Sequence, residues 1–256
     1  MILNRRMSDS NALSFTDKIA IVTGSTRGIG RAIADLISEL GGHVIYTGTA
    51  SSNSIGDQVG KEYWQLDASD KQSVTQFADR IEKLNRLDIL VNNAGINRND
   101  SVDEMKDEDW DIVMEVNLTT PMKLMRSATR VMKKQSSGRI LNISSLFGNI
   151  ARRHRNSYTT TKTGLVGLTR SAGLELAQYG ILVNALCPGF ILTDMTRKML
   201  TDEQRAELAN LVPLGRMGSE ADMAKVAAFM VSDWNTYMTT QTLVSDGGIS
   251  MSPGFG

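Results

Sequence analysis

Short apolar runs that alternate with stretches of helical periodicity constrain this chain of 256 residues more than any other feature. The runs are apolar almost throughout, which predicts strands buried on both faces. Such strands need helices on both sides of a parallel sheet, so the predicted fold class is α/β, a doubly wound parallel sheet. We expect strands at 19–24, 43–48, 88–95, 139–144 and 181–189, and helices at 28–42, 76–85, 107–134, 157–178 and 219–232.

A single domain is expected over residues 17–256, because no repeat, Pro-rich linker or block of charge interrupts the pattern. Residues 1–16 lack hydrophobic periodicity and are predicted to form a flexible N-terminal extension. The N-terminus has no apolar core typical of a signal peptide, and no uninterrupted apolar run approaches about 18 residues. We therefore expect a cytoplasmic protein without a membrane segment.

The charge and the counts of two residue types argue against two kinds of partner. Lys plus Arg number 28 and Asp plus Glu number 28, which gives a net charge of zero. Nucleic-acid binding draws its affinity from an excess of basic residues, so no nucleic acid is expected. Two His and one Cys, Cys187, are too few for a zinc site of the usual type, so no metal is expected either.

A glycine-rich turn, Thr23 to Gly30, directly follows the first predicted strand and opens the first predicted helix. Gly24 permits a tight turn, and Gly28 and Gly30 let a pyrophosphate and the neighbouring strand approach the backbone. The N–H groups and the positive dipole end of the helix would then face the anion. Between a buried strand and an amphipathic helix, this turn favours a dinucleotide site over a plain strand-to-helix connection.

The end of the second predicted strand favours NADPH over NADH. NAD-selective sites usually place a carboxylate there to bind the ribose 2′-hydroxyl. Residues 46–52 contain no Asp or Glu; Thr49, Ser51 and Ser52 offer hydroxyl groups, and Arg27 in the glycine-rich turn supplies a cation for a 2′-phosphate. The alternative is that Arg27 is only a solvated residue at the helix start.

Four polar residues form a candidate catalytic set. Tyr158 and Lys162 are four residues apart in a helical segment and therefore share a face, where the ammonium group can lower the pKa of the phenol. Ser145 follows a predicted strand, at the edge where ligands bind in parallel α/β sheets. Asn117 is an amide in an otherwise apolar helix and can anchor a water. Alternatively, Tyr158 and Lys162 are a surface pair, Ser145 is a helix cap and Asn117 a satisfied core amide.

In this order, the segments 23–30, 92–95, Asn117, Ser145, 158–162 and 188–190 resemble the classical short-chain dehydrogenase/reductase family, from about Phe15 to Met251. Within it, the segments 30–34, 90–98, 105–111, 188–195 and 244–248 resemble the 3-oxoacyl-(acyl-carrier-protein) reductases of fatty acid biosynthesis. The resemblance implies a Rossmann fold. It also implies that Tyr158 protonates the carbonyl oxygen, Ser145 orients the carbonyl, Lys162 holds the nicotinamide ribose and lowers the pKa of the tyrosine, and Asn117 anchors a water relay.

The resemblance further implies NADP(H) as cofactor, with Thr49 at the 2′-phosphate, Asp67 and Ala68 at the adenine, Asn93 near the adenosine ribose, and Ile191 and Thr193 at the carboxamide. The full set of residues expected to bind the cofactor is Gly24, Ser25, Thr26, Arg27, Gly28, Ile29, Gly30, Thr49, Asp67, Ala68, Asn93, Ala94, Gly95, Tyr158, Lys162, Pro188, Gly189, Ile191 and Thr193.

The chain departs from the carrier-protein reductases at two positions where basic docking residues are expected, since these hold Ser136 and Tyr179. In contrast, Arg152, Arg153, His154 and Arg155 lie on a loop between two catalytic positions. They offer charge to an acidic carrier, to an anionic group of a small substrate, or to an acid of a neighbouring subunit, unless the loop is merely solvated. Residues 193–216 resemble the family's mobile lid, with Met195, Met199 and Leu200 available to an acyl chain.

The sequence therefore predicts an NADPH-dependent carbonyl reductase that reduces a 3-oxoacyl group, most simply on an acyl carrier protein, to the 3-hydroxy product. A sugar or polyol dehydrogenase of the same family is the alternative enzyme. A dinucleotide-binding regulatory protein without turnover is a third hypothesis, which the complete set of Ser145, Tyr158 and Lys162 opposes. A homotetramer is expected from the resemblance, with helices 107–134 and 157–178 at the interface.

Overall fold

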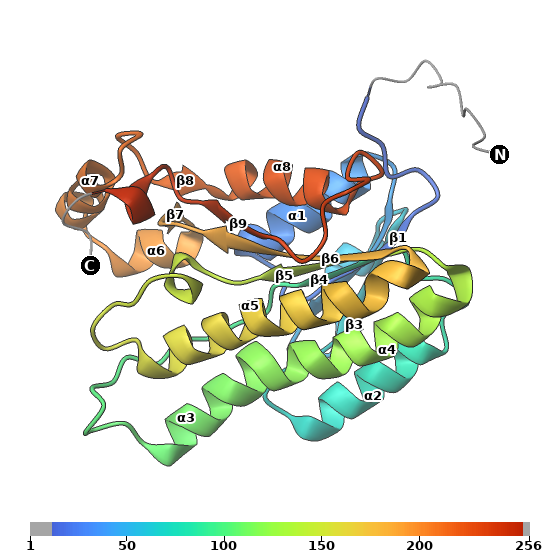
Figure 1. The fold of residues 1–256 in the computed structure, drawn as a ribbon, viewed down its shortest axis with the longest axis horizontal. Coiled ribbons are helices and arrows are strands. Elements are labelled where there is room, and N and C mark those ends of the chain that lie inside the picture. Colours follow the sequence, from blue (N-terminus) through green and yellow to red (C-terminus); the bar gives the residue numbers. More distant parts are fainter. Residues whose placement is uncertain (1–11, 253–256) are drawn as a thin grey trace.

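The computed structural model describes residues 12–252 and contains a seven-stranded, wholly parallel sheet (Figure 1). Its strands lie in the order β3-β2-β1-β4-β5-β6-β9, so the order reverses between β1 and β4. The strands are β1 (Ile19–Val22), β2 (His43–Gly48), β3 (Lys61–Gln65), β4 (Ile89–Asn92), β5 (Gly138–Ile143), β6 (Ile181–Pro188) and β9 (Thr242–Ser245). Two short strands, β7 (Ile191–Leu192) and β8 (Gly218–Ser219), pair separately beyond the carboxyl edge.

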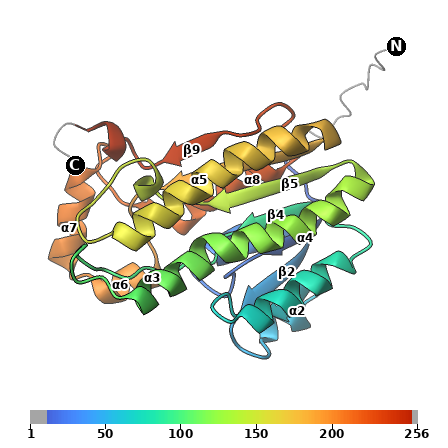
Figure 2. The same cartoon turned by 60° about the horizontal axis from the view of Figure 1, so that its bottom comes forward.

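Helices cover both faces of the sheet, as Figures 1 and 2 show from two directions. One face carries α1 (Gly28–Glu39) and α8 (Glu220–Val231), which pack against each other. The opposite face carries α2 (Lys71–Glu82), α4 (Thr120–Gln135) and α5 (Asn156–Leu176). The remaining helices, α3 (Asp107–Met114), α6 (Asp194–Met199) and α7 (Asp202–Leu211), lie toward the carboxyl ends of the strands.

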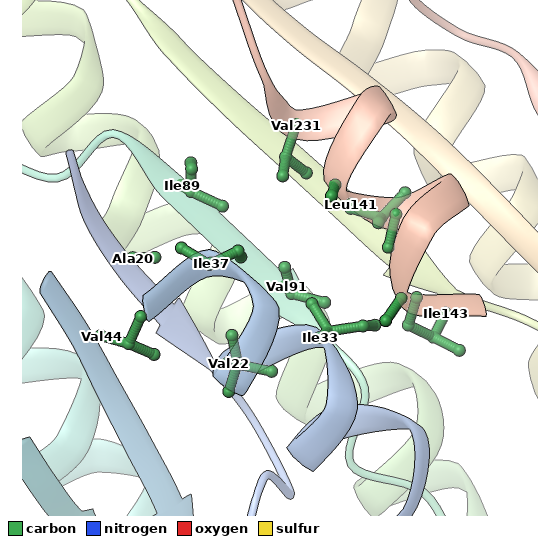
Figure 3. Packing of buried hydrophobic residues seen from close by; sticks show 14 of the residues in the cluster. Ala20, Val22, Ile33, Ile37, Val44, Ile89, Val91, Leu141, Ile143 and Val231 are labelled. Atoms are coloured by element: carbon green, nitrogen blue, oxygen red, sulfur yellow. The ribbon is translucent and has the colours of Figure 1, made fainter. Parts of the chain in front are cut away.

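The strands divide their side chains between two hydrophobic cores, because successive residues of a strand point to opposite faces. In β1, Ala20 and Val22 pack toward α1 and α8, whereas Ile21 packs toward α2 and α4. Figure 3 shows the first core, in which Ile33 and Ile37 of α1 lie over the sheet. Burial on both faces explains why the central strands are apolar throughout, and it confirms the predicted doubly wound α/β fold.

The structure differs from the sequence-based expectations at two edge strands, at the start of one helix and within one long predicted helix. The missed strands, β3 and β9, lie at the two edges of the sheet and alternate between buried or half-buried and exposed residues, so neither is a continuous apolar run. Helix α2 begins earlier than predicted, because Asp70 accepts hydrogen bonds from the N–H groups of Gln72 and Ser73. The segment predicted as one helix over 107–134 is α3 and α4, joined by a π-helical segment, η2 (Glu115–Thr119).

Most of the predicted N-terminal extension, residues 1–16, lies outside the described part of the chain. Within the described remainder, Phe15 is buried in the core beside α1, and its N–H donates to the carbonyl of Leu40 at 2.8 Å. Among residues 12–252, no helix combines the length and apolar character that crossing a membrane requires.

Candidate active site

The carboxyl ends of the strands bring the predicted site residues to one edge of the sheet. Because all seven strands are parallel, each connection that leaves this edge begins beside its neighbours. The glycine-rich turn follows β1, and Thr49 follows β2. The remaining segments are Asp67–Ala68 after β3, Asn93–Gly95 after β4, Ser145 after β5, and Pro188–Gly189 at the end of β6.

The glycine-rich turn is bonded to the connection after β4, across the point where the strand order reverses. The hydroxyl of Thr23 accepts the N–H groups of Asn93 at 2.8 Å and of Ala94 at 3.0 Å. In return, the side-chain amide of Asn93 donates to the carbonyls of Thr23 at 2.9 Å and Gly24 at 3.2 Å. The two connections therefore form one rigid floor.

The glycines of the turn make this floor possible. Gly24 and Gly28 adopt φ angles of +63° and +64°, a region that L side chains rarely occupy. A Cβ at Gly30 would lie 2.3 Å from Nδ2 of Asn93 and 2.6 Å from the carbonyl oxygen of Gly24. Gly30 thus lets the connection after β4 pack directly against the turn, whereas a Cβ at Gly28 would meet open space, with Oε1 of Glu220 as the nearest atom at 3.8 Å.

Helix α1 begins without a side-chain cap on its first N–H groups and without an acidic residue in its first turn. Of the other described helices, α2, α6, α7 and α8 are capped by a side chain, whereas α3, α4 and α5 are not. Uncapped N–H groups at the positive end of a helix dipole are suited to a phosphate. The turn thus fits a dinucleotide pyrophosphate.

Ser25 supports the turn from below. Its hydroxyl donates to the carbonyl of Val22 at 2.7 Å and accepts the N–H of Thr47 at 2.9 Å, and both groups are buried. The Ser25 side chain therefore ties the turn to β2. The backbone N–H of Ser25 also donates to the carbonyl of Thr47 at 3.0 Å, so both hydrogen-bond donors of Ser25 are used within the protein.

Arg27 and Thr49 lie at the place predicted for a 2′-phosphate. Both are exposed, and Arg27 forms no ion pair with any described residue. The turn abuts the end of β2, because a Cβ at Gly48 would lie 2.7 Å from Cγ2 of Thr26. The Arg27 guanidinium and the Thr49 hydroxyl are thus available to a 2′-phosphate at one edge of the floor.

At the predicted adenine position, the carboxylate of Asp67 accepts the N–H of Ser69 at 2.9 Å and its hydroxyl at 2.6 Å. These hydrogen bonds lower the pKa of Asp67. The neighbouring Ala68 is buried, and its carbonyl accepts the hydroxyl of Thr120 at 3.1 Å. Adenine binding by Asp67 and Ala68 stays a prediction, but hydrogen bonds hold both residues in place.

Tyr158 and Lys162 lie on consecutive turns of α5, near its N-terminus, and Nζ of Lys162 is 5.6 Å from the centroid of the Tyr158 ring. Burial raises the pKa of Tyr158, and a side-chain hydrogen bond with Ser145 and the charge of Arg155 oppose this rise. Burial lowers the pKa of Lys162 to about 8, and its Nζ donates to the carbonyl of Ile143 at 2.9 Å. The structure therefore unites the predicted tyrosine, lysine and serine.

Ser145 lies where β5 ends, and its hydroxyl accepts the N–H of Phe147 at 3.2 Å as the N-cap of a short 3-10 helix. The alternative interpretation as a cap is thus realised, together with the contact to Tyr158. A hydroxyl can serve both, because it accepts one hydrogen bond while donating another.

Asn117 lies in the π-helical segment η2, fully buried. Its amide donates to the carbonyl of Ile96 at 2.8 Å and to the hydroxyl of Thr161 at 3.2 Å, and its Oδ1 accepts the N–H of Ile96 at 2.8 Å. The side chain thus fixes the connection after β4. The predicted water relay through Asn117 stays a prediction.

Gly95 shows how closely these groups approach. A Cβ at Gly95 would lie 3.3 Å from Oδ1 of Asn117 and 3.4 Å from Nζ of Lys162. The glycine leaves the lysine reachable from the floor of the site.

At the end of β6, a Cβ at Gly189 would lie 2.6 Å from Cα of Asp246, so this glycine is packed against the connection after β9. Ile191 is buried, and the hydroxyl of Thr193 caps α6. The side chains of Met195 and Met199, predicted to line an acyl chain, lie outside the described side chains. Cys187 is fully buried beside Ser144 and Asn149, and burial raises the pKa of its thiol.

Sequence reasoning missed the residues that lock the site together. Thr23 and Thr47 bond the glycine-rich turn, and Thr161 bonds Asn117. The available signal was the polar residue at the end of an apolar strand, as in Thr23 before Gly24. Among the described residues, no three His, Cys, Asp or Glu side chains gather into a possible metal site.

The chain is similar to known proteins over most of its length. A family model described as enoyl-(acyl carrier protein) reductase matches residues 24–250. The 3-oxoacyl-(acyl-carrier-protein) reductase FabG of Haemophilus influenzae is 44% identical over 242 residues, which cover 92% of this chain and 99% of that protein. FabG of Escherichia coli is 40% identical over 244 residues, 93% of this chain and 100% of that protein.

Among solved structures, a putative NAD(P)-dependent gluconate 5-dehydrogenase from Beutenbergia cavernae with bound NADP superposes with a TM-score of 0.88. It is 35% identical, and the match covers 94% of this chain and 99% of that one. The chain belongs to the short-chain dehydrogenase/reductase family. The predicted family and the oxidoreductase class are confirmed, whereas the individual residue roles stay predictions.

Proposed function

We propose that this protein is an NADPH-dependent reductase that converts a 3-oxoacyl thioester, carried on an acyl carrier protein, to the 3-hydroxyacyl product. The supporting observation is the contact set of Tyr158, Ser145 and Lys162 beside an uncapped, glycine-lined helix start. The names of the FabG relatives support the substrate class, and the NADP in the solved gluconate dehydrogenase relative supports the cofactor.

The residues present fit NADPH. Gly28 leaves open space beside the turn, and the first N–H groups of α1 can donate hydrogen bonds to the pyrophosphate. Arg27, with the nearby hydroxyl of Thr49, would hold the 2′-phosphate, since no acidic residue opposes it there. When bound, the cofactor supplies the hydride.

Tyr158 carries the proton chemistry. Its raised pKa keeps the phenol protonated near neutral pH, which reduction requires, because the carbonyl oxygen must gain a proton as its carbon gains hydride. With substrate bound, the single proton of the Ser145 hydroxyl would be donated to the same oxygen in place of Tyr158 and would orient the carbonyl. The charge of Lys162 stabilises the phenolate left behind, and the positive end of the α5 dipole adds to this effect.

A second candidate activity is oxidoreduction of a sugar acid. The observations that favour it are the gluconate 5-dehydrogenase relative and Arg155, whose charge acts on Tyr158. The absence of basic residues at Ser136 and Tyr179 also removes one expected feature of carrier docking.

One assay separates these activities. Purified protein is given NADPH or NADH with acetoacetyl thioester or 5-ketogluconate, and nicotinamide absorbance is followed. Faster oxidation of NADPH with the thioester supports the proposal. Turnover of the sugar acid alone supports the second activity, and dinucleotide binding without any turnover contradicts both.

We further propose a cytoplasmic homotetramer. Apolar side chains are exposed on α5, near the end of α8 and along edge strand β9, in a pattern typical of an interface. They are Leu174, Phe229, Trp234, Tyr237 and Leu243. Size-exclusion chromatography with light scattering measures the number of subunits, and a monomer would contradict the proposed homotetramer.

A further inference from the structure

Arg155 occupies a position that the proposed reaction does not use. It is the N-cap residue of α5, and Tyr158 is the third residue of the same helix. The N-cap and third positions share one side of a helix start, as reciprocal capping pairs show. The charge of Arg155 also acts on the Tyr158 phenol, so a group bound by the guanidinium would lie near a substrate carbonyl at Tyr158.

The Arg155 guanidinium is half-buried and has no counter-charge. It forms no hydrogen bond or ion pair with any described residue, and Arg152 is close enough to add like-charge repulsion. Burial together with this repulsion lowers the pKa of Arg155. A partly desolvated cation without a partner is costly unless a ligand supplies the missing acceptor.

The facing loop offers a neighbour but no such partner. Asp100 forms an isolated parallel bridge with Arg155, and its N–H donates to the carbonyl of His154 at 3.3 Å. The side chain of Asn156 donates to the carbonyl of Asp100 at 3.0 Å. Both carboxylate oxygens of Asp100, however, are buried and accept no hydrogen bond from a described residue. The backbone contacts fix Arg155 in place and leave its guanidinium free.

We propose that Arg155 is a substrate-binding residue that donates hydrogen bonds to an oxygen two carbons from the reacting ketone. Guanidinium prefers carboxylate but also binds carbonyl oxygen, so a 3-oxo acid and a 3-oxoacyl thioester both provide this group. A carrier's distant phosphate lies too many bonds from the ketone to be reached. The inference rests on the proposed reduction at Tyr158 and adds selection for 1,3-dicarbonyl substrates.

The test compares Arg155→Gln with wild type on three ketones. These are the N-acetylcysteamine thioester of acetoacetate, acetoacetate itself, and pentan-2-one, which lacks the second oxygen function. Loss of a hydrogen bond from a charged donor should lower kcat/KM about 10- to 100-fold for substrates that use Arg155, with pentan-2-one unchanged. Loss confined to acetoacetate identifies the carboxylate as the bound group, and loss confined to the thioester identifies its carbonyl.

Matched variants separate binding from a structural role. Arg153→Gln removes an exposed arginine from the same loop and should leave all three substrates unchanged. Arg155→Lys should restore part of the activity toward acetoacetate. Equal losses on all three ketones, or the same losses in Asp100→Asn, would show that Arg155 only supports the loop, and would overturn the proposal.

Binding provides a readout that does not depend on turnover. Calorimetric titration of acetoacetate into protein saturated with NADP⁺ should give affinity that falls about 10-fold or more in Arg155→Gln but not in Arg153→Gln. If wild type reduces no ketone yet this difference appears, the proposed reaction fails and the Arg155 site stands. If turnover is present and the difference is absent from both measurements, the Arg155 site fails alone.

Discussion

The cofactor side and the substrate side of the site differ in how completely their polar groups are bonded. On the cofactor side, Thr23, Ser25 and Asn93 satisfy one another and the neighbouring backbone. On the substrate side, several buried oxygen atoms have no hydrogen-bond partner among the described residues, and Arg155 has no counter-charge. These atoms belong to Asn97, Asp100, Ser157 and Thr159.

The two sides of the site therefore bind their ligands by different means. A floor whose polar groups bond one another is preorganised, so the dinucleotide meets a surface that need not rearrange. Unsatisfied buried groups cost free energy until a ligand, water or another subunit bonds them. The substrate side is therefore where selectivity between substrates can be gained.

Replacement of Tyr158 by Phe should separate the two sides most strongly. Loss of the proton donor is expected to lower kcat by about 10² to 10⁴, the usual contribution of general acid catalysis. NADPH binding should persist, because the glycine-rich turn is untouched. Steady-state kinetics and fluorescence titration of NADPH measure both, and retained turnover would falsify the role of Tyr158.

Gly30→Ala should damage the cofactor side. The added Cβ would overlap Nδ2 of Asn93 and the carbonyl of Gly24, so either the floor shifts or the fold loses about 1–3 kcal/mol of unfolding free energy. Denaturant unfolding and NADPH titration measure the two effects. An alanine variant with unchanged stability and unchanged NADPH affinity would contradict the rigid floor.

Arg27→Gln should weaken NADPH about 10- to 100-fold while leaving NADH unchanged, since a charged hydrogen bond to the 2′-phosphate is lost. The control is Arg153→Gln, which removes an exposed arginine from the substrate side. Dissociation constants for both nucleotides are measured by fluorescence. Equal losses for the two nucleotides would assign Arg27 to another role.

The pH dependence should report Lys162, which lies where the two sides meet. Its pKa of about 8 means that its charge is lost as pH rises through that value, so kcat/KM for NADPH should fall about tenfold per pH unit above it. Lys162→Arg should move the break to higher pH. A break unaffected by this substitution would belong to another group.

Unfolding does not account for such a fall. The native pKa of Lys162 lies below its ordinary value of 10.5, so between about 8 and 10.5 the unfolded chain binds more protons than the native one. The contribution of this group to stability therefore rises with pH in that window. Circular dichroism at each pH should show an intact fold throughout.

The sequence predicted the central strands and the proximity of Ser145, Tyr158 and Lys162 for a physical reason. Buried strands such as β4 and β5 are apolar along their whole length, and Tyr158 and Lys162 share a helix face at fixed spacing. Edge strands β3 and β9 were not predicted because each exposes part of its surface to solvent. Their pattern is weak, and tertiary pairing determines them.

The partners of individual side chains could not be predicted. Asn117 was expected to bind backbone or water, but the sequence did not show that the partner of its amide is Ile96, a residue 21 positions away. Likewise, the sequence could not show that Asp100 lies on the loop facing Arg155 without bonding its guanidinium. Periodicity gives the face of a helix, but not what another connection places opposite it.

The bonds between Thr23 and Asn93 also have a consequence for biosynthesis. These residues are 70 positions apart, so the floor does not exist while only β1 and α1 have left the ribosome. Forming it closes a long loop, which is slow compared with forming local helices. A nascent chain that ends before β4 should carry the complete glycine-rich motif and still fail to retain the nucleotide, and nucleotide capture would thus mark the moment when the first half of the sheet is assembled.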